Sequence, residues 1–186
     1  GVGGVQGDLY IRGGGFDQTL LLVDGMKMDD AQTGHHTLNM ILPLYLIERV
    51  EIIKGPAARI FGQNAFNGAI NIVTKDFDGE KGTIHMNLNE LSYGSFEQKN
   101  ISLSTKITAE NIKSLISYSG NRSDGYRHNT DFKRNNYFVK TSFNTNKSPV
   151  NIIASFNENK FGANGFYASP SATEQYEETQ VSLLGV

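Results

Sequence analysis

The residues best suited to chemistry in this sequence are two adjacent histidines, His35 and His36, in a polar segment from Asp29 to Asn39. Imidazole nitrogens ligate transition metals and haem iron, so the pair is a candidate metal site. Adjacent side chains on an extended strand point to opposite faces, so joint ligation would require a bent loop. We therefore favour a polar contact with a ligand, and we predict no metal site and no bound cofactor.

Groups for covalent catalysis do not form a recognisable set. The chain has no cysteine, and no serine stands in a familiar arrangement with a histidine and an acid. The glycines in residues 1–7 are wrongly spaced for a dinucleotide fingerprint, and Lys54 precedes Gly55 instead of following a phosphate-binding loop. The sequence predicts a protein that is not an enzyme.

Charge and hydropathy limit the other function classes. The 186 residues include 17 Lys+Arg and 19 Asp+Glu, and the net charge of −2 argues against nucleic acid as a partner. The longest apolar run, 40–47, contains Pro43 and is too short for a transmembrane helix, which needs about 20 apolar residues. Because the chain starts at Gly1 without a leader and stops within an apolar alternation, we interpret it as a fragment.

Serine and glycine divide the chain into two halves. Every serine lies after residue 90, whereas most glycines lie before residue 80. A shift of this kind predicts two domains, 1–77 and 78–186. In the first domain, Asp24-Gly25 between apolar runs predicts a hairpin, and residues 50–53 and 69–73 are predicted to be further strands. Short helical turns are expected at 43–47 and 56–61.

The second half alternates apolar and polar residues, which is the period of β-strands. The polar faces are interrupted only at Leu115, Phe138 and Ile153. Segments of about ten residues suffice for a tilted transmembrane strand. After a first hairpin at 92–95, the expected connections alternate between short turns, at 108–111 and 145–149, and long loops, at 120–134 and 158–175. This pattern favours an outer-membrane barrel, and a soluble β-sandwich remains the alternative.

Five motifs in the first half occur in an order and spacing that resemble the plug of TonB-dependent outer-membrane transporters. They are Ile11-Arg12-Gly13, Thr19 to Gly25, Ile47 to Ala57, Phe61-Gly62 and Gly68 to Lys75. The segment 30–36 also resembles the corresponding loop of cobalamin-transporter-like members from Bacteroidetes-type bacteria. The resemblance implies a mainly β fold, with a small α+β plug followed by about six strands of a large antiparallel transmembrane barrel.

The resemblance also implies which residues meet the ligand and the barrel wall. Arg12 and Lys54 are expected to pair with carboxylates of the wall, since a buried cation needs a partner. The expected substrate-binding residues lie at the plug apex and on outer loops: Asp30, Gln32, Thr33, His35, His36, Asn64, Phe66, Tyr126, Phe166 and Tyr167. Aromatic residues nearer the strand ends, such as Tyr93 and Tyr137, are assigned to the interfacial girdle.

The function implied by the resemblance is active import of a scarce solute across the bacterial outer membrane. The expected partners are the TonB energising complex of the inner membrane, outer-membrane lipid and a small-molecule substrate, and an accessory outer-membrane lipoprotein is left open. Cobalamin is the first substrate hypothesis, and a ferric siderophore or haem is the second. A passive porin or a secreted β-sandwich adhesion module is the alternative class.

Overall fold

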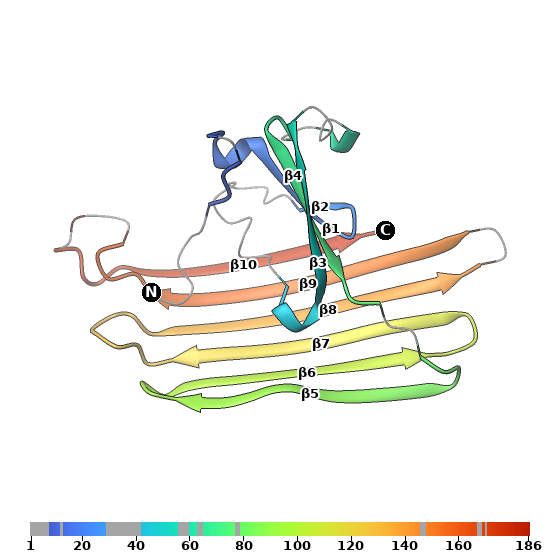
Figure 1. Cartoon of the computed structure of the whole chain (residues 1–186). Helices are drawn as coiled ribbons and strands as arrows, with labels where there is room; N and C mark the ends of the chain where they lie inside the picture. The colour runs from blue at the N-terminus through green and yellow to red at the C-terminus, as the bar shows by residue number, and fades with distance from the viewer. Residues whose placement is uncertain are drawn as a thin grey trace. The chain divides into compact units, whose positions relative to one another are not determined.

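The computed structural model describes residues 8–11, 13–28, 42–55, 60–62, 65–76, 79–145, 148–166, 169 and 171–186. The chain divides into two compact units, one within Gln6–Asp76 and the other within Phe77–Val186. The first contains a four-stranded sheet and the second a six-stranded sheet (Figure 1). No helix in these described ranges is long and apolar enough to span a membrane.

The N-terminal sheet is built around β1 (Thr19–Val23), in which all five residues are buried. The predicted hairpin to β2 (Met26–Met28) is confirmed. Its turn places Asp24 and Gly25 at φ 49° and 81°, the left-handed pair that a two-residue hairpin requires. On its other side β1 pairs in parallel with β4 (Gly68–Thr74). Strand β1 therefore has a hydrogen-bonded neighbour along both edges.

Strand β4 lies between β1 and β3 (Ile47–Lys54), giving the order β2-β1-β4-β3. Strands β3 and β4 run antiparallel and approach closely at Gly68, where a Cβ would come within 2.6 Å of the Ile53 carbonyl oxygen. Two short 3-10 helices, η1 (Phe16–Gln18) and η3 (Leu44–Leu46), precede β1 and β3. The helical turn expected after Pro43 is therefore present, while residues 56–59 of the second expected turn lie outside the described ranges.

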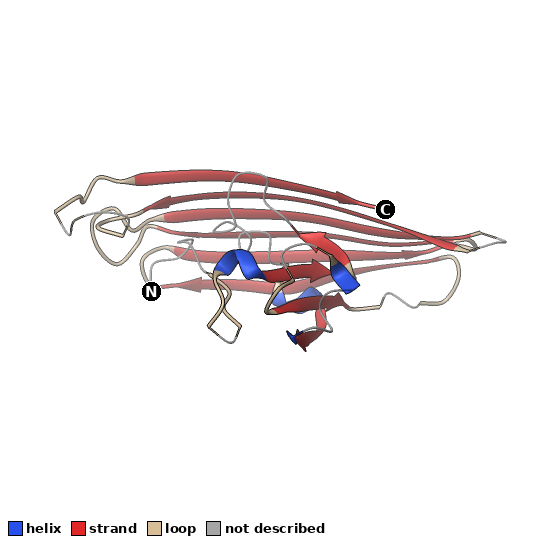
Figure 2. Cartoon of the chain, turned by 90° about the horizontal axis from the view of Figure 1, so that it is seen from above, coloured by secondary structure: helices blue, strands red, loops and turns tan. Residues whose placement is uncertain are grey.

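The C-terminal unit is a meander of six antiparallel strands in the order β10-β9-β8-β7-β6-β5. They are β5 (Thr83–Gly94), β6 (Gln98–Thr108), β7 (Ile112–Ser123), β8 (Phe132–Asn144), β9 (Pro149–Gly162) and β10 (Tyr176–Gly185). They lie side by side in one continuous layer (Figure 2). Strands of 10–14 residues are long enough to cross a bilayer at a tilt.

The two faces of this sheet differ in polarity, as the alternation predicts. We call the face that carries Ile101, Ile116, Val139 and Phe156 the apolar face, and its large side chains are exposed. The opposite, polar face carries buried Ser102, Ser104, Ser117, Ser119, Asn136, Ser155, Asn157 and Asn159, together with the three apolar exceptions Leu115, Phe138 and Ile153. An exposed apolar face this extensive needs a nonpolar surrounding, which confirms the transmembrane barrel interpretation over a soluble sandwich.

Both long connections lie at one end of the sheet, together with one short turn. Connections 124–131 and 163–175 lie at the end that also carries the β5–β6 turn, and we call this the loop end. The other end carries the tight β6–β7 and β8–β9 turns. Both long loops are shorter than expected, because β7 and β9 continue past the apolar region. Phe161, expected in a loop, is therefore a fully buried residue of β9, and Phe132 begins β8.

Replacing Val139 with arginine tests the assignment of the apolar face. Val139 is exposed on that face, and arginine near a bilayer midplane costs about 2–4 kcal/mol in a transmembrane barrel. We expect Val139→Arg to lower the free energy of unfolding in lipid vesicles by that amount. The control Lys140→Arg places the same side chain on the polar face one residue away, and an equal loss in both variants would contradict the assignment.

Candidate functional site

The described residues include only part of the predicted substrate site. Phe66, Tyr126 and Phe166 are exposed, by 74%, 55% and 48%. The remaining candidates lie outside the described ranges, and they are Asp30, Gln32, Thr33, His35, His36, Asn64 and Tyr167. Among the described residues, no group of three or more His, Cys, Asp or Glu side chains is placed to hold a metal ion. Tyr126 and Phe166 belong to two different loops of the C-terminal unit, and the structure joins these loops.

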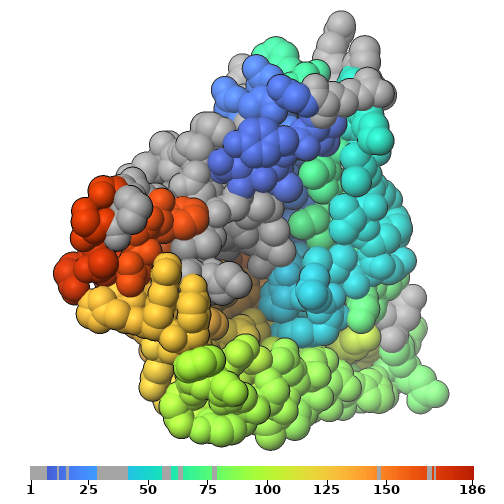
Figure 3. All heavy atoms as spheres, turned by 60° about the vertical axis from the view of Figure 1, so that its left-hand side comes forward, coloured from blue at the N-terminus to red at the C-terminus, as the bar shows by residue number. Residues whose placement is uncertain are grey.

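The two long loops are held together through Asn129. Its side-chain amide donates to the carbonyl oxygens of Thr173 (2.8 Å) and Gln175 (2.6 Å), and its own carbonyl accepts from the Asn164 backbone N–H at 3.2 Å. The loops lie against each other at the loop end, the first in yellow-orange and the second in orange-red (Figure 3). Asn129 adopts a left-handed φ of 50°, which asparagine tolerates better than most residues. The half-buried amide therefore acts as a clasp between two loops.

Charged and polar side chains reinforce this loop contact at its surface. Arg127 Nη2 donates to the Asn164 carbonyl at 3.3 Å, and Asn164 Nδ2 donates to the His128 carbonyl at 2.6 Å. His128 Nε2 lies 2.6 Å from the Glu174 carboxylate, and this contact is the main cause that lowers the pKa of Glu174. Both side chains of the pair are largely exposed, so solvent screens the interaction and its contribution to stability is small.

The turn of the β5–β6 hairpin is also hydrogen-bonded to these loops. In its turn, Phe96 and Glu97 both have positive φ, which leaves the Phe96 carbonyl free to accept from Asp124 N–H at 2.9 Å and from Ser123 Oγ at 3.0 Å. Three connections at the loop end are thus linked by hydrogen bonds. Together they form a rim from which Tyr126 and Phe166 project, an arrangement suited to enclosing a ligand without covalent chemistry.

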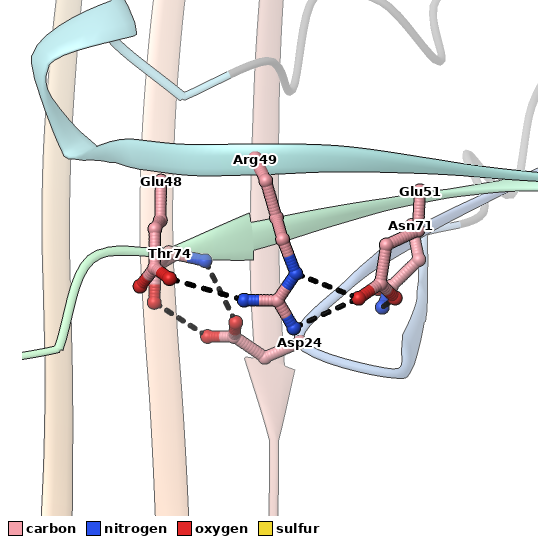
Figure 4. Close-up of polar contacts among 6 residues, drawn as sticks. All are labelled: Asp24, Glu48, Arg49, Glu51, Asn71 and Thr74. Carbon is pink, nitrogen blue, oxygen red and sulfur yellow. Dashed lines mark hydrogen bonds and ion pairs between the residues drawn. The ribbon is translucent and has the colours of Figure 1, made fainter.

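A network of charged and amide groups crosses the N-terminal sheet (Figure 4). Arg49 donates to Glu48 (3.1 Å) and to Glu51 (2.8 Å). Glu51 also accepts from Asn71 Nδ2 at 2.9 Å, and Asn71 Oδ1 accepts from the Gly25 N–H at 2.9 Å. The network therefore connects β3, β4 and the β1–β2 turn.

Asp24 anchors the same turn to the end of β4. Its carboxylate accepts from the Thr74 N–H at 2.8 Å and from Thr74 Oγ1 at 2.7 Å, and Thr74 is buried. Hydrogen bonds to a charged group contribute about 1.5–3 kcal/mol, more than neutral ones. The sequence Asp24-Gly25 predicted the hairpin, but it carried no signal for the contact between Asp24 and Thr74, which are 50 residues apart.

The pKa of the Glu51 carboxyl is lowered from its ordinary value of 4.5, first by the Asn71 hydrogen bond and then by Arg49. A lowered pKa means that the ionised form is favoured in the folded unit. Its stabilising contribution is present at neutral pH and is lost as the pH falls below about 4.5 through the folded value.

The two cations expected to meet the barrel wall remain predictions. Lys54 ends β3 with an exposed side chain, and no carboxylate of the described part of the chain lies within ion-pair distance of it. Arg12 is outside the described residues.

Comparison with known proteins supplies an independent assignment of the first half. Residues 1–69 match the family described as TonB-dependent receptor plug domain. A vitamin B12 transporter of Vibrio vulnificus strain YJ016 is 33% identical over 122 residues, which is 65% of this chain and 19% of the relative. An iron-regulated outer membrane virulence protein of Vibrio cholerae is 39% identical over 79 residues, 39% of this chain and 12% of the relative. The chain thus spans at most a fifth of these relatives.

Solved structures agree on the fold. The copper transporter OprC aligns with a TM-score of 0.68 at 19% identity, covering 85% of this chain and 25% of that chain. The siderophore receptor PirA from Pseudomonas aeruginosa aligns with a TM-score of 0.62 at 23% identity, covering 83% and 28%. At these identities the likeness shows the fold, which combines a plug with strands of a large barrel.

The contribution of Asp24 can be measured by replacing it with alanine in the full-length protein. Because Asp24→Ala removes both bonds to Thr74, we expect the N-terminal unit to lose about 2 kcal/mol of stability. Hydrogen exchange of the β4 amides at increasing urea reports this loss. Asp17→Ala, an exposed carboxylate in η1, is the control; similar exchange in both variants would refute the anchoring role of Asp24.

The loop clasp is tested by Asn129→Asp, which keeps the side-chain shape but presents oxygen atoms to two carbonyls. Loss of two hydrogen bonds predicts at least about tenfold faster exchange of amides in 124–131 and 163–175. Asn111→Asp, in the β6–β7 turn at the opposite end, should leave those rates unchanged. Unchanged loop exchange in Asn129→Asp would show that the clasp does not hold the loops.

Proposed function

Residues 1–69 belong to the TonB-dependent receptor plug domain family, and on that premise we propose that the protein imports a scarce solute across the outer membrane. The observation that carries the proposal is the combination, in one chain, of a plug-family unit with a six-stranded sheet whose apolar face is exposed. A passive porin has no need of such a plug, and a secreted adhesin has no need of an exposed apolar face. The outer membrane is accordingly the location of the protein.

Cobalamin is the substrate that we propose first, and a ferric siderophore or haem is second. The vitamin B12 transporters of Vibrio align over 48–65% of this chain, and the iron-regulated virulence protein aligns over 39%. Siderophore receptors share the fold at identities that carry no information about the ligand. We propose that the ligand contacts the apex segment with His35 and His36 together with Phe66, Tyr126 and Phe166 on the outer side.

The proposed transport cycle involves no covalent step. The solute binds at the outer rim, where the clasped loops present exposed aromatic side chains. The TonB complex then pulls on the plug from the periplasm, and the difference in ligand affinity between resting and pulled states releases the solute inward. The polar network from Arg49 to Asn71 and the Asp24–Thr74 bonds keep the strands of the N-terminal sheet together, so that a pulling force is transmitted through the unit.

Calorimetric titration of the full-length protein in detergent tests this function. Cyanocobalamin is the ligand, and ferric siderophores and haem are comparators. We expect tight cobalamin binding that weakens about tenfold or more in the His35→Ala, His36→Ala double variant, because each lost polar contact costs about 1 kcal/mol. His85→Ala, a histidine of β5 away from the loop end, is the matched control.

Binding of a siderophore or haem in place of cobalamin would overturn the substrate proposal and keep the transporter. A full-length protein that partitions into the aqueous phase during detergent extraction would overturn the outer-membrane transporter itself.

A further inference from the structure

Asn164 is followed directly by a glycine, and in this dipeptide the backbone can attack the neighbouring side chain. Glycine has no Cβ to shield its amide nitrogen, and its backbone rotates freely enough to bring that nitrogen to the side-chain carbonyl of the preceding asparagine. The sequence contains two such dipeptides, Asn67-Gly68 and Asn164-Gly165. They lie in different units of the chain and are held in different ways.

Both reacting groups of Asn164-Gly165 are engaged in hydrogen bonds. The group that would leave, the Asn164 side-chain amide, donates to the His128 carbonyl oxygen at 2.6 Å. The group that would attack, the Gly165 backbone N–H, donates to the Ala172 carbonyl oxygen at 3.0 Å. The amide and the N–H must both be released before a reaction between them can begin.

Release of these groups requires only a local opening of the loops. Asn164 is half-buried, and its bonds to the other loop are made with Arg127, His128 and Asn129. These bonds belong to the same loop contact that the Asn129 side chain clasps. Surface loops open at a lower free energy than a fully paired sheet does. The loop contact therefore determines how often Asn164 and Gly165 are free to react.

Asn67-Gly68 is held by the sheet itself. Gly68 begins β4 and pairs with β1 on one side and with β3 on the other. Asn67 donates to Gln18 through its backbone N–H at 3.1 Å and through its side-chain amide at 2.7 Å, and its carbonyl accepts from the Gly55 N–H at 3.2 Å. Because a reaction here would require the N-terminal sheet to come apart, this dipeptide is an internal reference for Asn164-Gly165.

We propose that Asn164 is a site of spontaneous deamidation whose rate is controlled by the loop contact. In the open loops, the lone pair of the Gly165 nitrogen forms a bond to Asn164 Cγ and closes a five-membered succinimide ring. The bond from Cγ to Nδ2 breaks, and the proton lost by the Gly165 nitrogen leaves with the amide as ammonia. A solvent water then opens the ring at either carbonyl and gives aspartate or isoaspartate. This modification goes beyond the transport function, since it requires only the two loops and water.

Either product weakens the contact that slows its formation. The new carboxylate presents an oxygen to the His128 carbonyl where the amide donated, so a hydrogen bond is replaced by repulsion. Isoaspartate also adds a methylene to the main chain beside Gly165, which has a φ of 66°. Arg127 is exposed, so solvent screens any ion pair with the new carboxylate, and that pair offsets little of the loss. Deamidation is therefore a one-way step toward open loops.

The first test follows both dipeptides in one sample of the full-length protein in detergent. Peptide mass spectrometry after timed incubation at neutral pH measures conversion to aspartate and isoaspartate at residues 164 and 67, and the protein in urea gives the unprotected rate of each. We expect Asn164 to react more slowly than in urea but faster than Asn67. Conversion of Asn164 as slow as that of Asn67, or as fast as in urea, would overturn the proposal.

Asn129→Asp tests control by the loop contact. When opening is fast relative to the chemistry, the rate follows the population of the open state. Conversion of Asn164 should therefore rise at least about tenfold, as loop amide exchange does, while Asn67 stays unchanged. Asn111→Asp, at the opposite end of the sheet, should change neither rate. The same rate at Asn164 in Asn129→Asp and in the unaltered protein would refute control by the loops.

A second variant opens the contact by another route. A Cβ at residue 162 would overlap the Asn129 side-chain oxygen, so Gly162→Ala displaces the clasp without changing any polar group. We expect faster conversion at Asn164 and an unchanged rate at Asn67. Equal acceleration of both dipeptides in both variants would show that Asn164 responds only to general unfolding, and the proposal would fail.

The consequence of the modification is measured with Asn164→Asp, which carries the aspartate product from the start. Loss of the hydrogen bond to His128 predicts about fivefold faster exchange of the amides in 124–131. Asn111→Asp is again the control. Unchanged exchange in Asn164→Asp would show that the modification does not open the loops and would overturn the one-way step.

Discussion

The structure depends first on the requirement that backbone N–H and C=O groups be paired where a membrane supplies no hydrogen bonds. Strands β5 to β10 meet this requirement by pairing along almost their whole length, with one register shift, between Leu88 and Glu90. Continuous pairing makes the register rigid, and a rigid register assigns every side chain to one face. The apolar face and the buried serine and asparagine side chains of the polar face both follow from it.

The N-terminal unit is held together by side chains more than by long strands. Its four strands are short, and its central strand β1 is buried along its whole length between an antiparallel and a parallel neighbour. Parallel pairing closes a long stretch of chain, which is entropically costly and must be offset by specific contacts. Two such contacts link the β1–β2 turn to β4: Asp24 accepts from Thr74, and Asn71 accepts from Gly25 while it donates to Glu51.

At the loop end, ordering comes from side chains that bond to backbone. The side chains of Asn129 and Asn164 each donate a hydrogen bond to the other loop. The Phe96 carbonyl accepts from the first of these loops and so links the β5–β6 hairpin to them. Pre-ordered loops lose less conformational entropy on binding, which would favour tight binding of the solute in the proposed function. The strands thus provide a rigid frame for the loops, and in the proposed function the loops provide the surface that contacts the ligand.

Local patterns were sufficient to predict much of this protein. Period-two alternation predicted the six C-terminal strands and their two faces, and Asp24-Gly25 predicted the β1–β2 hairpin. The order and spacing of five motifs predicted the plug family that residues 1–69 match. Each of these signals lies within a few residues of chain, where steric and hydrophobic preferences act directly. The loop boundaries were wrong at Phe161 and Phe132, because alternation does not reveal where a strand stops pairing. Only the tertiary structure decided the parallel pairing of β1 with β4 and the Asn129 clasp, because these depend on contacts between residues distant in sequence, which no local preference encodes.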